Sequence, residues 1–207
     1  MPRQMQRLDQ VFAKQVADAL SIAQAGEKAR LLTASFSVKN LEVLYEAAFL
    51  RVFVQWEVFL EEAFLRYLCG HQSRHGVASL AKTKAYATSL SGAKSAVLGS
   101  QSYVLWHNPF KVVKRSTEHF VKGRHEIVVS SAYARIEAMA HVRHRIAHGH
   151  QDARAKFEKA TLMFAGRTFS AARVGRFLRD SDYSVSPPRR WIDILANELS
   201  SLANQIV

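Results

Sequence analysis

Apolar residues recur at helical spacing along most of the chain, which predicts an all-α fold. Residues 3–25 carry an apolar residue at every fourth position, and this helix is expected to end near Gly26. A last helix is expected to start at Ser186-Pro187-Pro188, because a cap residue is followed there by prolines suited to a first turn. Its apolar stripe continues to Ile206. Each of these helices is predicted to bury one face.

The longest predicted helix covers residues 41–69 and ends at Gly70. It has two apolar faces separated by polar rows, and a helix of this kind is buried on two sides. It is then either central to the domain or shared between a core and a subunit interface. The first face consists of Tyr45, Phe49, Val52, Trp56, Phe59, Ala63 and Tyr67. The second face consists of Val43, Leu50, Val54, Val58 and Leu65.

The middle of the chain is less regular. Residues 71–108 mix glycine, serine, lysine and histidine, which predicts an irregular basic insertion. Asn108-Pro109 marks a turn or a helix start, and a short basic helix is expected over residues 111–121.

A clear helix is predicted over residues 130–148, with Gly149 as its stop. Residues 152–185 are ambiguous and are expected to hold a short helix and a loop. Because no internal repeat or obvious linker interrupts the pattern, residues 1–207 are predicted to form one domain.

Charge is distributed unevenly along the chain. Residues 1–70 are neutral, whereas residues 71–130 carry a net +7 and residues 131–207 a net +5, for a total of +12. All nine histidines lie between His71 and His150. A basic surface of this kind most often meets a polyanion, with nucleic acid as the first candidate and simple solubility charge as the alternative.

Composition narrows the class of protein further. A hydrophobic fraction of 48% is enough for a sizeable core, so global disorder is not expected. The single cysteine, Cys69, excludes an internal disulfide and a cysteine-rich zinc site. No signal-peptide pattern and no uncharged apolar run of roughly 18 residues is found. The expectation is a soluble, cytoplasmic protein that does not enter a membrane.

Residues 143–150, Arg-His-Arg-Ile-Ala-His-Gly-His, carry the most specific chemistry. Arg143 offers a permanent charge and a fork of donors that fits phosphate oxygens. His148 offers a proton carrier near neutral pH. On a helical wheel, Arg143 falls within the apolar face of Ile136, Met139, Ala140, Ile146 and Ala147, where a charge must be paired or must open on a cleft. A buried ion pair with Glu46, Glu57 or Glu61 is the purely structural alternative.

The spacing of this pair sets a geometric condition. Arg143 and His148 are five positions apart, so on an ideal helix they point about 140° away from each other. They meet one substrate only if the helix loosens near Gly149, if a cleft wraps the helix edge, or if a second subunit completes the site. This condition favours a dimer.

A metal site is the competing interpretation of the same helix. His141, His144 and His148 lie on one arc, with Glu137 beside them, and their spacing would let three imidazoles share one zinc. A solvated histidine-rich face is the alternative. No metal or other cofactor is predicted, because no further ligand is evident and His-Glu-x-x-His is absent from the sequence.

Arg143-His144 with His148 resembles the arginine–histidine motif of the HEPN superfamily. Residues 142–149 are similar to the family's usual RN-x-x-AHG signature, with His144 at a position that is often Asn. Trp56-Glu57-x-Phe59-Leu60-Glu61 resembles the family's first core helix. Gly175-Arg176-Phe177-Leu178-Arg179 is similar to the RiboL-PSP-HEPN branch. The resemblance covers about residues 41–205, without residues 71–108.

The resemblance implies a helical bundle that dimerises and acts as a metal-independent endoribonuclease, a hydrolase of toxin–antitoxin or phage-defence systems. The RNA's own 2′-hydroxyl would attack phosphorus and leave a 2′,3′-cyclic phosphate and a 5′-hydroxyl. Arg143 and His148 would be the catalytic pair, with His144 in support and Glu57 as an acidic contributor from the early helix. Candidates for RNA binding are Lys111, Lys114, Arg115, Arg145 and His150. The implied partners are RNA, a second copy of the chain, and a cognate antitoxin or immunity protein.

A second hypothesis is a non-catalytic HEPN module that binds RNA or protein and uses the motif only for dimer contacts. It predicts salt-dependent RNA binding without cleavage. A zinc hydrolase is the third hypothesis, which requires a stoichiometric metal.

Overall fold

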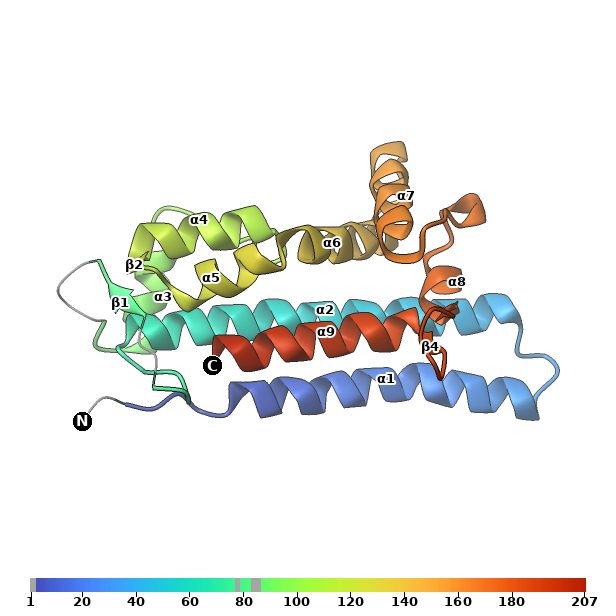
Figure 1. Cartoon of the computed structure of the whole chain (residues 1–207), viewed down its shortest axis with the longest axis horizontal. Coiled ribbons are helices and arrows are strands. Elements are labelled where there is room, and N and C mark those ends of the chain that lie inside the picture. Colours follow the sequence, from blue (N-terminus) through green and yellow to red (C-terminus); the bar gives the residue numbers. More distant parts are fainter. Residues whose placement is uncertain (1–2, 77–78, 83–86) are drawn as a thin grey trace. The chain divides into compact units, whose positions relative to one another are not determined.

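The computed structural model describes residues 3–76, 79–82 and 87–207, and most of these residues are helical (Figure 1). The predicted all-α class is therefore confirmed, and the described residues form nine α-helices. The helices are α1 (Leu8–Leu32), α2 (Val38–Leu68), α3 (Leu90–Leu98), α4 (Pro109–His119), α5 (Arg124–Ser131), α6 (Tyr133–Ala147), α7 (Gln151–Ala165), α8 (Val174–Arg179) and α9 (Trp191–Ile206). A short 3₁₀ helix covers Ser170–Ala172. Two antiparallel pairs of short strands complete the fold, β1 (Leu80–Ala81) with β2 (Phe120–Val121) and β3 (Ser181–Asp182) with β4 (Arg189–Arg190).

The chain divides into two compact units. Unit 1 contains Met1–Phe12, Trp56–Ile136 and Ser200–Val207, and unit 2 contains Ala13–Gln55 and Glu137–Leu199. The boundary falls inside α1, α2, α6 and α9, so each of these helices contributes residues to both units. One domain over residues 1–207 stays a prediction.

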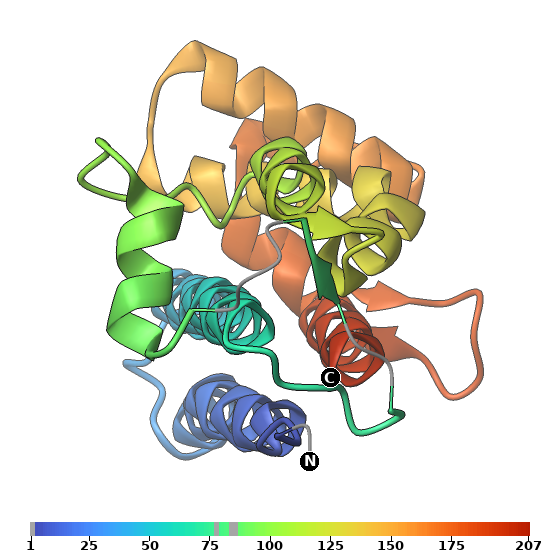
Figure 2. The same cartoon turned by 90° about the vertical axis from the view of Figure 1, so that its left-hand side faces the viewer.

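Unit 1 has an aromatic core around Phe64 on α2. The ring of Phe64 lies 5.3 Å from Trp106, 5.0 Å from Phe120 and 5.1 Å from His125, measured between centroids. Phe120 belongs to β2, whose pairing with β1 lies next to α4 in the view of Figure 2. Aromatic burial thus ties the short helices of the middle segment to α2.

His125 is fully buried in this core, although it is polar. Its Nε2 lies 3.0 Å from the carbonyl oxygen of Leu60, and Nδ1 has no hydrogen-bond partner among the described residues. The neutral tautomer with a proton on Nε2 satisfies this geometry, because Nε2–H then donates to the carbonyl. Burial lowers the pKa of His125 to about 4.

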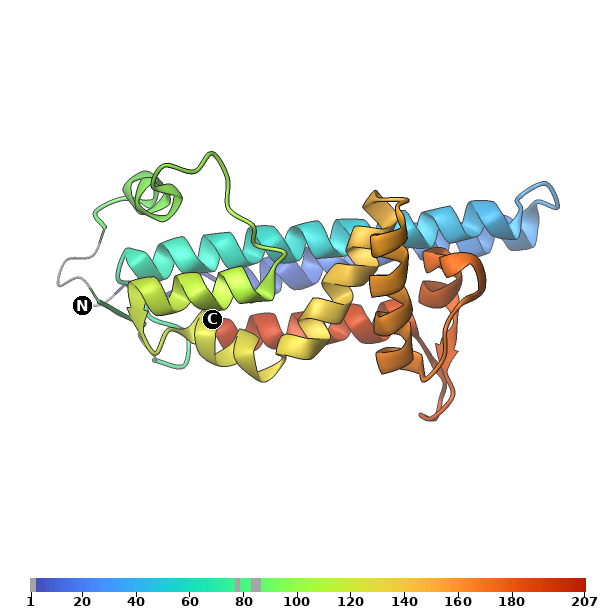
Figure 3. The same ribbon diagram turned by 90° about the horizontal axis from the view of Figure 1, so that it is seen from above.

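Unit 2 is built around Phe177 on α8. Its ring lies 5.3 Å from Phe169, 6.0 Å from Phe157 and 5.8 Å from Trp191, so α8 joins α7 to the start of α9. The C-terminal part of α1 and the N-terminal part of α2 run antiparallel beside a short loop (Figure 1). Figure 3 shows α6 and α7 running in different directions from the turn that joins them.

A close approach fixes α8 against α2 within unit 2. A Cβ on Gly175 would lie 2.3 Å from the backbone oxygen of Glu42, so only glycine fits at this position. The backbone N–H of Gly175 donates to Glu46 Oε1 at 2.9 Å. The guanidinium of Arg173 donates twice to Glu42 Oε2, at 2.9 and 2.6 Å. A buried carboxylate and a backbone contact therefore hold the start of α8 in place.

Several predicted helix boundaries are wrong. Helix α1 does not end at Gly26 but continues to Leu32. Gly26 lies at a close contact with α2, where a Cβ would be 2.6 Å from Leu44 Cδ1, so the glycine is explained by packing and not by a helix end. The helix predicted over residues 130–148 is α6, but it begins at Tyr133, because residues 130–131 end α5 and a turn at Ala132 separates the two helices. Ser186-Pro187-Pro188 precedes strand β4, and α9 begins only at Trp191.

The other predictions hold in part. Asn108 caps α4 through a bond from Lys111 N–H at 3.1 Å, as expected, but α4 ends at His119 and residues 120–121 form β2. Residues 71–108 contain α3 and β1, so the insertion is more ordered than predicted. Residues 152–185 hold most of α7 as well as α8, where one short helix was expected.

The first apolar face of α2 is buried as predicted, whereas the second is not buried within the chain. Val43, Val54 and Val58 are exposed, with relative exposures of 55, 40 and 44%. Only Leu65 of this face is buried, with a relative exposure of 8%. Burial of both faces inside one chain is therefore wrong, and the role of this face in a subunit interface stays a prediction.

Among the described residues, none of the helices combines the length and the apolar character that crossing a membrane requires.

The free energy of unfolding should decrease as the pH is lowered from 7 towards 4, because His125 is buried in its neutral form. Its unfolded pKa is about 6.5 and its folded pKa about 4, so between these values the unfolded state binds more protons. The contribution is complete above about pH 6.5 and is lost as the pH falls towards 4, at up to about 1.4 kcal/mol per pH unit. Urea denaturation from pH 7 to 5 measures it. His125→Gln, which keeps a donor for Leu60, should flatten the slope, and an unchanged slope would contradict the assignment.

Gly175→Ala should destabilise the protein, because the new methyl group meets the Glu42 backbone. The expected loss in the free energy of unfolding is about 1–3 kcal/mol, as for other overpacked sites. Gly149→Ala is the matched control, since nothing lies within 4 Å of a Cβ there. Equal stability of the two variants in urea would show that the close approach is not a constraint.

Candidate functional site

The C-terminal half of α6 carries the histidine-rich segment in unit 2. The helix buries Met139 and Val142 on one face, which leaves Arg143, His144 and Arg145 half-buried around its other sides. The backbone N–H of His148 still bonds to the carbonyl of His144 at 2.9 Å, so helical bonding continues one residue past Ala147. The helix does not loosen before His148, and the chain turns only at residues 149–150.

His150 caps the next helix. Its Nδ1 accepts a hydrogen bond from the backbone N–H of Ala153 at 3.2 Å, and α7 begins directly after it. Because a helix start leaves its first N–H groups without partners, this side chain replaces the more usual serine, threonine, asparagine or aspartate cap. The cap fixes the position of His150 against the end of α6.

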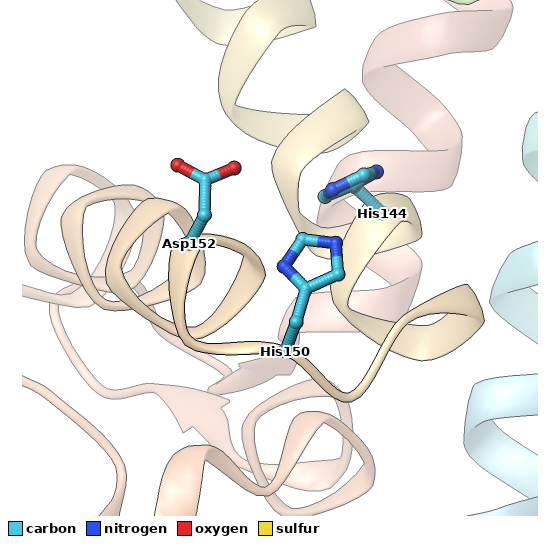
Figure 4. A group of neighbouring side chains, drawn as sticks. All are labelled: His144, His150 and Asp152. Atoms are coloured by element: carbon cyan, nitrogen blue, oxygen red, sulfur yellow. The ribbon is translucent and has the colours of Figure 1, made fainter.

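Three imidazoles gather at this turn. The ring centroid of His144 lies 4.5 Å from His148 and 5.3 Å from His150, and those of His148 and His150 are 5.6 Å apart. Figure 4 shows the ring of His150 between His144 and Asp152. Burial lowers the pKa of His144, and electrostatic interactions with His148, Lys156 and His150 lower it further, whereas the Asp152 carboxylate raises it. The neutral ring of His144 is therefore favoured beside His148.

A cavity of about 280 Å³ opens beside this cluster within unit 2. Arg145, His148 and Gly149 line one side, and Glu46 with residues 171–174 line the other. Arg145 and His148 are three positions apart, which puts them on one side of the helix. The guanidinium of Arg145 also donates to the carbonyl of His148 at 3.2 Å. The C-terminal end of α6 therefore places the guanidinium of Arg145 and the imidazole of His148 at the same cavity.

The opposite wall has an unusual backbone. Ala171 and Ala172 both have positive φ values, 55° and 46°, which are costly for residues with a Cβ. Such conformations persist only where the surroundings impose them, and they concentrate at functional sites. Here the wall is held by the Arg173–Glu42 and Gly175–Glu46 contacts that follow it in sequence.

The charges around the cavity are not equivalent. Arg173 is paired with the buried carboxylate of Glu42, and Glu46 accepts from a backbone N–H. Arg145, in contrast, bonds to a neutral carbonyl and keeps its full positive charge for an incoming anion. The cavity therefore holds one cation next to His148, Arg145, and one carboxylate on its other wall, Glu46.

Arg143 and His148 do not line one cavity within the chain, and their role as a catalytic pair stays a prediction. Arg143 is half-buried on α6 and lies outside the lining of the cavity that holds His148. Arg145 occupies the corresponding place beside His148, although the sequence interpretation gave it only an RNA-binding role. Within one chain, the side chains of Arg143 and His148 therefore do not meet at the same cavity.

The other candidates lie in unit 1. A carboxylate oxygen of Glu57 lies 3.4 Å from Nδ1 of His107. Lys111 and Lys114 are exposed on α4, whereas Arg115 stacks over the ring of Trp106 at 5.5 Å, and burial lowers its pKa. Their catalytic and RNA-binding roles stay predictions.

Sequence reasoning missed the wall formed by Glu46 and residues 171–174. The i, i+3 spacing of Arg145 and His148 was a usable signal for the cation side of the cavity. The positive φ values of two alanines left no signal, because glycine and asparagine usually mark such positions.

The competing metal interpretation, with His141, His144 and His148 as ligands, does not match the grouping of side chains in the structure. Among the described residues, His144, His150 and Asp152 have potential ligand atoms within 4.8 Å of one another. His141, one turn earlier on α6, is not part of this group.

Comparisons of the chain with family models, curated proteins and solved structures found no match.

His150→Ala should destabilise α7, because the cap bond to Ala153 is lost. The expected cost is about 1 kcal/mol in the free energy of unfolding, and His150→Asn should restore most of it, since asparagine is a strong cap. Urea denaturation of the three proteins measures this order. If alanine and asparagine behave alike, His150 does not act as a cap.

Proposed function

We propose that this chain is a metal-independent endoribonuclease of HEPN type that cleaves RNA by attack of the 2′-hydroxyl on the adjacent phosphorus. The observation that carries the proposal is the shared cavity of His148 and Arg145, with a second, neutral imidazole beside His148. A phosphodiester needs a proton carrier and a positive charge at the same place, and both are present.

His148 moves the proton in this mechanism. As a base it takes the proton of the 2′-hydroxyl, whose oxygen forms a bond to phosphorus while the bond to the 5′-oxygen breaks. The leaving 5′-oxygen takes a proton from water, His148 returns its proton to solvent, and the products are a 2′,3′-cyclic phosphate and a 5′-hydroxyl. General acid–base catalysis of this kind contributes about 10²–10⁴-fold. His144, which stands one turn before His148, positions its ring.

Two arginines are candidates for charge stabilisation. Arg145 lies in the cavity and would contact the phosphoryl oxygens directly. Arg143 is the residue that the HEPN resemblance points to, and it would act on the same phosphate from a second copy of the chain. The exposed valines of α2 support a dimer, since they form an apolar strip that a partner helix could cover.

The basic segments of the chain favour RNA as the polyanion. Residues 71–207 carry all of the excess positive charge, including Lys111 and Lys114. In a cell, uncontrolled cleavage of RNA would stop growth, so we propose a role as a toxin or phage-defence effector with an antitoxin or immunity protein as partner.

The decisive experiment is cleavage of an end-labelled single-stranded RNA by the purified full-length protein in excess EDTA. Cleavage should occur, and the products should carry cyclic phosphate ends by mass spectrometry. His148→Ala should lower the rate about 10²–10⁴-fold. DNA of the same sequence and 2′-O-methylated RNA should stay intact, because both lack the nucleophile.

Matched variants separate the residues. His141→Ala lies on the same helix, outside the cavity, and should cleave like the parent protein. If only Arg145→Ala slows cleavage, the cavity of one chain is the site, whereas loss in Arg143→Ala would indicate the site completed by a second chain. Salt-dependent RNA binding with no cleavage by a folded protein would refute the enzyme and favour the non-catalytic module.

A further inference from the structure

We propose that His144, His150 and Asp152 form a binding site for a zinc-class divalent cation at the turn between α6 and α7. Two imidazoles and one carboxylate are a ligand set that suits Zn²⁺, with water in the remaining position. The site differs from the three-histidine group that was the competing interpretation of the sequence, and it does not depend on the proposed nuclease.

The backbone brings the three side chains together. His144 is in the last turn of α6, His150 is the cap of α7, and Asp152 is in the first turn of α7. Their potential ligand atoms lie within 4.8 Å of one another, and Figure 4 shows the three side chains around one space. Tetrahedral zinc needs ligand atoms about 3.4 Å apart, given bonds of about 2.0–2.2 Å. His150 and Asp152 are exposed, so rotation of their side chains closes this gap.

The protonation states suit a metal. Burial is the main cause that lowers the pKa of His144, and nearby Lys156 lowers it further while Asp152 raises it, so the net effect favours the neutral imidazole that a metal requires. The hydrogen bond from Lys156 lowers the pKa of Asp152, so its carboxylate is ionised. These shifts agree with the geometry and are not needed for it.

Two existing contacts compete with the cation. Lys156 Nζ lies 2.7 Å from Asp152 Oδ2 and neutralises the carboxylate. Nδ1 of His150 accepts the cap bond from Ala153, so the neutral ring carries its proton on Nε2. Coordination through Nε2 moves this proton to Nδ1, and coordination through Nδ1 uses its lone pair, so either mode gives up the cap bond. These two contacts should weaken binding of the cation. Removing the Lys156 contact should therefore make binding tighter, which can be measured.

The experiment is titration of the full-length protein, without a polyhistidine tag and after removal of metals, with Co²⁺ as a spectroscopic substitute for Zn²⁺. One Co²⁺ per chain should bind with visible absorption typical of a tetrahedral site, and Zn²⁺ should displace it. His144→Gln, His150→Asn and Asp152→Asn should each weaken binding by about tenfold or more. His150→Asn keeps the helix cap, so its loss of binding would not arise from unfolding.

Two further variants complete the design. His141→Gln, one turn earlier on α6, should bind like the parent protein. Lys156→Met should bind several-fold more tightly, because the carboxylate is released from its ion pair. The proposal is overturned if Co²⁺ shows no saturable one-to-one binding, if the His144 and His150 variants bind like the parent, or if Lys156→Met binds no more tightly. RNA cleavage plays no part in these readouts.

Discussion

The close contact between the start of α8 and α2 is the constraint on which the candidate site depends. Gly175 lies against the Glu42 backbone, and the two glutamates of this turn of α2 hold Arg173 and the Gly175 N–H. The two alanines that precede these contacts in the chain have a left-handed backbone, a conformation that persists only where the surrounding structure imposes it. The cavity wall facing His148 is thus a consequence of helix packing, and its shape is set by residues that need not touch a ligand.

The turn from α6 to α7 has an equally direct effect. Because the turn is short, His144 and His148 at the end of α6 and His150 at the cap of α7 have their imidazole rings next to one another. Crowded imidazoles disfavour one another's positive charge, as the lowered pKa of His144 shows. A histidine that acts as a helix cap adds a further restriction, because the lone pair that accepts the backbone N–H is unavailable to a proton or a metal.

The sequence predicted the helical class and the main helices because apolar spacing along α1, α2 and α9 reports directly on burial. It failed at Gly26, where glycine fills a crowded contact inside a helix, and at Ser186-Pro187-Pro188, where tertiary pairing of β3 with β4 overrides the local start signal. For the candidate site, the motif pointed to the end of α6, next to which the cavity lies. Arg145 lies beside His148 at a cavity whose other wall is formed by residues 171–174, and Asp152 lies beside His150 at the start of α7. Both arrangements depend on tertiary packing, which a local sequence pattern does not report.

The boundary between the two units crosses four helices, and this has a practical consequence for dissecting the protein. A fragment limited to unit 2 would be cut within α1, α2, α6 and α9, leaving helix ends without caps and apolar residues without their helical neighbours. Unfolding of one unit would also disrupt the parts of α1, α2, α6 and α9 that belong to the other unit. Function is therefore best mapped by substitutions in the intact chain, and truncation would report mainly on folding.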